Sequence, residues 1–114
     1  MSLEKVKKLF SSPPDASNAM LLLNDVLAAS VELVSLDDND FTWSSWRDRD
    51  AATAELDGVL VGVRNGVVPL RLTASVLFAP TGPMQELGMS SGWAETFIRL
   101  ADYFDAAERV LWPR

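Results

Sequence analysis

The sequence contains neither cysteine nor histidine. Without cysteine the chain forms no disulfide, has no thiol nucleophile and supplies no thiolate to a metal ion. Without histidine it lacks the side chain that most often acts as a general base near neutral pH and as a metal ligand. These two absences exclude the commonest nucleophile and base pairs and most zinc sites.

Long apolar runs are also absent. The longest stretch without a charged residue lies between Arg71 and Glu86, and it includes Pro80 and Pro83. It is shorter than the apolar length that spans a bilayer. The lysine-rich start meets Ser11-Ser12-Pro13-Pro14 before the apolar core of a signal peptide could form. We therefore expect a cytoplasmic protein without a membrane segment.

Basic residues are few and unevenly placed. The chain carries 10 basic and 16 acidic residues, and all three lysines lie within the first eight residues. Residues 9–46 contain six acidic residues and no basic one, which gives this segment a net charge of −6. Such a surface repels nucleic-acid phosphate and favours a basic protein partner. We expect no direct contact with nucleic acid.

The length and composition predict a single domain over residues 1–114, because 114 residues with 48% hydrophobic side chains can bury a core of their own. Apolar residues at helical spacing predict four helices. These are residues 2–10, about 17–34 with a cap at Asp15 or Ser17, about 45–64 with a cap at Ser45, and 90–112. On the last helix, Glu95–Arg99 and Asp105–Arg109 have the spacing of surface ion pairs.

Residues 70–78 alternate between apolar and polar side chains, which is typical of a strand with one buried face. Pro80-Thr81-Gly82-Pro83 has turn composition, and Gly82 suits a left-handed turn position. Met84 to Met89 then predicts a returning strand. The expected fold class is thus α+β, with about four helices packed on an antiparallel β-hairpin at residues 70–89. Two strands are marginal alone, so the hairpin edges could also join two copies into a homodimer.

Gly88-Met89-Ser90-Ser91-Gly92 matches the G-x-S-x-G pattern of a hydrolase nucleophile elbow. No histidine is present to activate the serine, so we interpret Ser90 or Ser91 as the cap of the last helix. Free backbone N–H groups at that helix start make Ser90, Ser91 and Gly92 a candidate anion site.

Asp37, Asp38 and Asp40 precede a pair of tryptophans, Trp43 and Trp46. The spacing of the aspartates lacks the glycine and glutamate of an EF-hand loop, so we assign no metal to them. The two indoles either close one end of the core or form an exposed anchor for a partner. These five residues are the candidate partner-binding site.

Three segments resemble parts of small bacterial proteins without an assigned activity. They are Trp43-Ser44-Ser45-Trp46, Leu77 to Pro83 with Gln85-Glu86, and Ser90-Ser91-Gly92-Trp93. The resemblance spans residues 41–105 and implies no particular chemistry.

The predicted function is a non-enzymatic binding protein with an acidic surface, of the kind that neutralises a toxin, and it requires no cofactor. The plentiful carboxylates leave a small hydrolase or lyase as an alternative, in which two buried Asp or Glu side chains would share one cleft. A structural homodimer is the other alternative.

Overall fold

The computed structural model describes residues 3–113, and every regular element in that range is helical. The elements are α1 (Glu4–Phe10), α2 (Ala19–Val34), α3 (Arg49–Arg64), α4 (Arg71–Ser75), the 3₁₀ helix η1 (Val76–Phe78), α5 (Pro83–Ser91) and α6 (Ala94–Leu111). None of these helices is long and apolar enough to cross a membrane.

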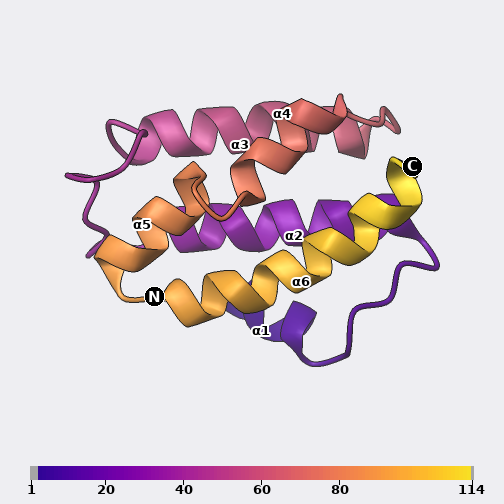
Figure 1. Cartoon of the computed structure of the whole chain (residues 1–114), viewed down its shortest axis with the longest axis horizontal. Coiled ribbons are helices and arrows are strands. Elements are labelled where there is room, and N and C mark those ends of the chain that lie inside the picture. The colour runs from indigo at the N-terminus through magenta and orange to yellow at the C-terminus, as the bar shows by residue number, and fades with distance from the viewer. Residues whose placement is uncertain (1–2, 114) are drawn as a thin grey trace.

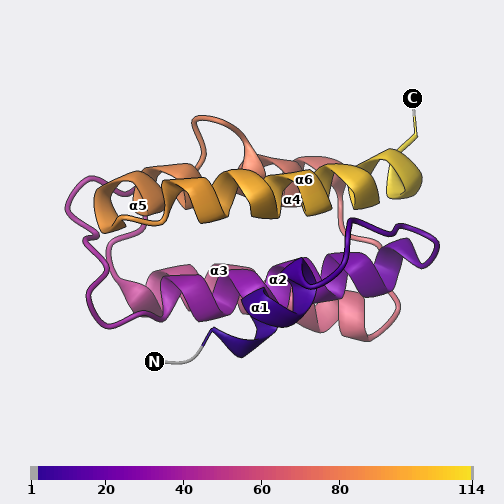
Figure 2. The same cartoon turned by 90° about the horizontal axis from the view of Figure 1, so that it is seen from below.

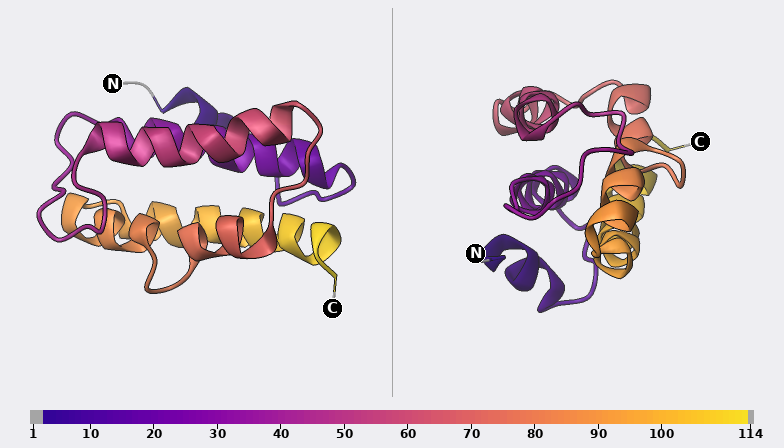
Figure 3. Two further views of the ribbon diagram at one scale, coloured as in Figure 1. Left: turned by 90° about the horizontal axis from the view of Figure 1, so that it is seen from above. Right: turned by 90° about the vertical axis from the view of Figure 1, so that its left-hand side faces the viewer.

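The helices form two layers (Figure 2). One layer contains α1, α2 and α3, and the other contains α4, η1, α5 and α6 (Figure 3). The long helix α2 lies between α3 and α1 and also packs across the layers against α6 (Figure 1). Its sequence explains this position, because ten of its residues are buried and they surround most of the helix.

The apolar stripes predicted for the long helices are confirmed. Leu22, Val26, Ala29 and Leu33 of α2 are buried, as are Ala52, Leu56, Val59 and Val63 of α3. The predicted N-caps are wrong by one to three residues. Asn18 caps α2 by accepting a hydrogen bond from Leu21 N at 3.1 Å. Asp48 caps α3, with Ala51 N at 2.9 Å, so Ser45 is free for another contact.

The predicted β-hairpin is wrong, and with it the α+β fold class, because residues 70–89 form α4, η1 and α5. Of the alternating apolar residues, Leu70 and Leu72 are 79% and 81% exposed. The buried residues are Ala74, Leu77 and Phe78, which have helical spacing. A short apolar run is compatible with the two-residue period of a strand and with the 3.6-residue period of a helix, and here it forms a helix.

The expected turn at residues 80–83 also differs. Pro83 is the first residue of α5, where its missing N–H and fixed φ suit a helix start. Gly82 has φ −85°, so it is not left-handed. It is required for space, because a Cβ atom there would lie 2.3 Å from the Val76 carbonyl oxygen. With no strand among residues 3–113, a dimer through hairpin edges has no strands to join.

The last helix begins at Ala94 rather than at Ser90 or Ser91. Gly92, with φ 88°, ends α5, and the chain then turns directly into α6. The predicted Glu95–Arg99 and Asp105–Arg109 pairs are not among the ion pairs of the described residues. Arg99 instead lies over the Phe10 ring at 4.4 Å and donates to the Phe10 carbonyl at 2.9 Å, which fixes the end of α1 on α6.

Candidate functional site

The segment that joins α2 to α3, residues 35–48, contains all five residues of the predicted partner site, and we call it the α2–α3 loop. It crosses from one helix to its neighbour at the end of the molecule where α5 meets α6 (Figure 1). It has no regular secondary structure, so side chains from α5 and from the loop itself must satisfy its backbone groups.

Two serines of α5 hold the middle of the loop. Ser90 Oγ donates to the Asp40 carbonyl oxygen at 2.7 Å, and Asp40 N donates to Ser91 Oγ at 2.9 Å. Both backbone groups of Asp40 are therefore satisfied by the two serines. The acidic run and the Gly88–Gly92 motif were separate candidate sites in the sequence. In the fold they are in contact, because Asp40 of the run is hydrogen-bonded to Ser90 and Ser91 of the motif.

Two further contacts hold the loop on either side of Asp40. Glu86 Oε1 accepts from the Ser45 hydroxyl at 2.7 Å and from Ser45 N at 3.1 Å. The Asn39 side chain accepts from the Trp93 indole N–H at 2.9 Å and donates to the Leu33 carbonyl at 2.8 Å. Asn39 thus links the end of α2, the loop and the start of α6.

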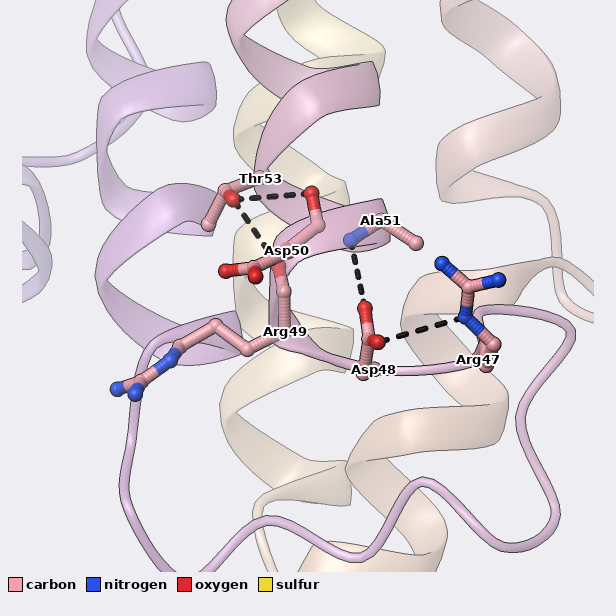
Figure 4. A network of polar contacts seen from close by, with 6 residues as sticks. All are labelled: Arg47, Asp48, Arg49, Asp50, Ala51 and Thr53. Atoms are coloured by element: carbon pink, nitrogen blue, oxygen red, sulfur yellow. Dashed lines mark hydrogen bonds and ion pairs between the residues drawn. The ribbon is translucent and has the colours of Figure 1, made fainter.

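The loop ends at a polar network around the first turn of α3 (Figure 4). The Asp48 carboxylate faces Ala51 N on one side and Arg47 Nε, at 3.4 Å, on the other. The hydrogen bond from Ala51 N is the main reason that the pKa of Asp48 lies below its ordinary value, and Arg47 adds to this. The carboxylate therefore stays ionised at the positive end of the α3 dipole.

The two tryptophans of the loop have opposite environments. Trp46 is 5% exposed and belongs to the core, whereas Trp43 is 76% exposed. The sequence does not predict this difference in burial, because the two residues are of the same type and only three positions apart. The structure therefore divides the predicted pair into one packing residue and one surface indole.

The three aspartates of the loop also differ. Asp37 lies 3.4 Å from Arg49 NH1, with 77% of its side chain exposed. Asp38 is exposed. Hydrogen bonds from Thr42, through its side chain and its backbone N–H, lower the pKa of Asp40. Within residues 3–113 no group of three or more acidic side chains is arranged to hold a metal ion.

Ser90, Ser91 and Gly92 lie at the C-terminal end of α5, where the helix presents carbonyl groups and the negative end of its dipole. The anion-site hypothesis depended on these residues starting a helix, and that premise is wrong. Ser90 Oγ also lies 3.2 Å from the carbonyl oxygens of Glu86 and Leu87. The serine hydroxyls are thus occupied in structural contacts.

A second feature was not predicted from the sequence. A cleft of about 320 Å³ opens between α1, the α1–α2 connection and α2, and the C-terminal end of α3 completes it. Its lining includes three basic side chains, Lys5, Lys8 and Arg64, together with Asp15 and Asp25. We call it the α1–α2 cleft. The one signal in the sequence was the confinement of the lysines to the first eight residues.

The alternative function, a hydrolase or lyase, requires two neighbouring carboxylates. Among the described residues, Asp105 and Glu108 are a candidate pair. On α6, partial burial and then the nearby Glu108 charge raise the pKa of Asp105, while Arg109 opposes the shift. Glu108 itself pairs with Arg71 at 3.6 Å. Asp105 is exposed, so this is a surface cluster rather than the buried cleft that the hypothesis required.

Comparison of the chain with protein-family models, with curated proteins and with solved structures finds no match.

Proposed function

We propose that the chain is a non-enzymatic binding protein that docks a basic protein partner on the α2–α3 loop. The observation that carries the proposal is that Trp43 is 76% exposed on a loop fixed to α5 and α6 by side-chain hydrogen bonds. Large aromatic side chains that become buried at the centre of an interface contribute much of its binding energy.

The attachment of the loop matters because ordering a mobile segment on binding costs free energy. Asp40, Ser45 and Asn39 are already held by partners on α5 and at the start of α6. Their contacts fix the backbone on both sides of residues 41–44. An indole presented in this way enters a partner pocket with little further loss of loop entropy.

The negative charge of the loop favours a basic protein partner. Asp38 is exposed, and Asp37 is 77% exposed although it lies 3.4 Å from Arg49 NH1. Asp40 also keeps its charge while it accepts a hydrogen bond from Thr42 N. Asp37 and Asp38 precede the Trp43 segment in the loop, and their charges would accelerate association with a positively charged surface. A basic toxin in the cytoplasm is one partner of this chemistry, as expected from the sequence.

Capture of partners with variants tests the proposal. The chain is immobilised as wild type, as Trp43→Ala, as the double variant Asp37→Asn with Asp38→Asn, and as Ile98→Ala. Ile98, on α6, is 59% exposed and serves as an apolar control that is not part of the α2–α3 loop. Proteins retained from a lysate of the source organism are identified by mass spectrometry, and binding of each is then measured with the purified partner.

We expect a basic protein that binds wild type and Ile98→Ala equally, binds Trp43→Ala at least about tenfold more weakly, and loses affinity with added salt. Absence of any basic partner contradicts the proposal. Equal binding by Trp43→Ala and Ile98→Ala contradicts the assignment of the site even if a partner is found.

A further inference from the structure

We propose that the α1–α2 cleft binds a small phosphate monoester that carries hydroxyl groups, such as a sugar phosphate. This site is separate from the α2–α3 loop and does not depend on the proposed function. Its volume of about 320 Å³ lies at the lower end of the range for small-molecule sites.

The first argument is the gathering of positive charge on an acidic protein. Lys5 and Lys8 are three residues apart on α1 and therefore share a face, and Arg64 reaches the same cleft from the last turn of α3. None of the three forms an ion pair with a residue in the described range 3–113. Three cations that share a cleft repel one another, and a phosphate dianion would relieve that repulsion.

The second argument is that a hydrogen bond orients the arginine of the cleft. Arg64 Nε donates to Asn24 Oδ1 at 3.2 Å, which orients the guanidinium group and leaves its two terminal nitrogens without a hydrogen-bond partner among the described residues. A planar guanidinium with two free nitrogens is the preferred partner of a phosphate group.

The third argument concerns the two acidic residues of the cleft, which offset part of the positive charge but form no ion pair with Lys5, Lys8 or Arg64 among the described residues. Asp15 accepts a hydrogen bond from Ser17 N at 3.0 Å, and Asp25 accepts one from the Asn24 side chain at 3.2 Å. Their remaining oxygens are acceptors for hydroxyl groups, and the Asn18 side chain lies beside them. The lining therefore has cations for a phosphate and acceptors for hydroxyl groups of the same ligand.

The α1 helix that carries the lysines is positioned for this role by α2. The Glu32 carboxylate accepts from Lys5 N and from Val6 N, both at 2.9 Å, and Val6 is buried against the core. The lysine side chains thus project from a helix whose backbone is fixed.

Titration of the ¹⁵N-labelled chain with inorganic phosphate, glucose 6-phosphate and glucose tests the proposal by NMR. We expect shifts of the Arg64 Nε–H and of amides at residues 17–25 with both phosphates, tighter binding of glucose 6-phosphate than of phosphate, and no shifts with glucose. Arg64→Gln and Lys8→Gln should each weaken binding by about tenfold.

Lys7→Gln is the matched control, because it removes the same charge from the same helix at a residue outside the cleft lining. It should change the affinity by less than about twofold. The proposal is overturned if phosphate shifts no cleft resonance, if glucose 6-phosphate binds no better than phosphate, or if Lys7→Gln weakens binding as much as Lys8→Gln. The shift map of the wild type decides the location even if a variant fails to fold.

Discussion

The indole N–H of Trp93 donates to the side-chain oxygen of Asn39 at 2.9 Å, across a separation of 54 residues. Trp93 is 7% exposed, so its N–H has little access to water if that partner is removed. We expect Asn39→Ala to lower the free energy of unfolding by about 1–3 kcal/mol, the cost of leaving a buried donor unpaired. Urea denaturation measures this loss.

The neighbouring Asp38→Ala provides the control, because this exposed side chain has no such partner in the described chain. It should change stability by less than about 0.5 kcal/mol. If Asn39→Ala is as stable as Asp38→Ala, the indole contact does not hold the loop, and the fixed presentation of Trp43 rests on the contacts of Asp40 and Ser45 alone.

Two glycines within helices should respond to alanine in opposite directions. A Cβ atom at Gly88 would lie 2.9 Å from Trp93 Cε3, whereas one at Gly58 on α3 meets nothing within 4 Å. We expect Gly88→Ala to destabilise the protein by about 1–3 kcal/mol because the Trp93 ring must move. Gly58→Ala should stabilise it by about 0.4–1 kcal/mol through helix propensity and a less flexible unfolded chain.

Thermal unfolding of both glycine variants checks this contrast. The structural roles of its residues explain the Gly88-Met89-Ser90-Ser91-Gly92 motif without catalysis. Gly88 makes room for Trp93, the serines hold Asp40, and Gly92 takes the left-handed conformation that ends α5. A stabilising Gly88→Ala would contradict the packing role.

The long helices could be predicted from the sequence because each has enough apolar residues at the helical period to exclude the two-residue period of a strand. In α3, Ala52, Leu56, Val59 and Val63 extend over three turns. Residues 70–78 are too few to distinguish a helix from a strand by periodicity. Of their alternating apolar residues, Ala74 and Phe78 are buried, whereas Leu70, Leu72 and Val76 are exposed, so the period-two pattern was a poor guide to burial.

The sites were harder to predict because they depend on contacts between distant segments. Spacing identified Trp43 and Trp46 as notable, but it carries no information on which indole the core accepts. The contacts of Asp40 with Ser90 and Ser91 join residues about fifty positions apart. The α1–α2 cleft likewise requires Arg64 to meet Lys5 and Lys8, which only the packing of α1 and α3 on α2 determines.

Glu32 should be required for the position of α1. This helix has seven residues, too few to be stable alone, and the Glu32 carboxylate satisfies two N–H groups of its first turn. We expect Glu32→Ala to cost about 1–3 kcal/mol of stability and to increase hydrogen exchange of α1 amides. Glu55→Ala, which removes an exposed carboxylate from α3, should do neither.

Hydrogen exchange followed by mass spectrometry separates these outcomes. If α1 remains as protected in Glu32→Ala as in wild type, the apolar contact of Val6 is sufficient to hold the helix, and the capping role is contradicted.

Asp105 should make the protein less stable as pH rises through the acidic range. Burial and the Glu108 charge raise its pKa above the ordinary value of 3.8, so the folded state holds the proton more tightly than the unfolded chain. The ionised carboxylate therefore opposes folding, and its cost is absent below pH 3.8 and complete once the pH exceeds the folded-state pKa. At neutral pH, Asp105→Asn removes that cost.

We expect Asp105→Asn to be more stable than wild type at pH 7 by less than about 0.5 kcal/mol, because solvent screens a mostly exposed carboxylate. At pH 3 the two proteins should unfold at the same temperature. Asp57→Asn removes an equal charge from an exposed position of α3, so it measures the effect of net charge alone. Thermal unfolding of all three proteins at both pH values isolates the contribution of Asp105. A gain in Asp57→Asn equal to that in Asp105→Asn would trace the effect to overall charge rather than to the burial of Asp105 and the nearby Glu108 charge.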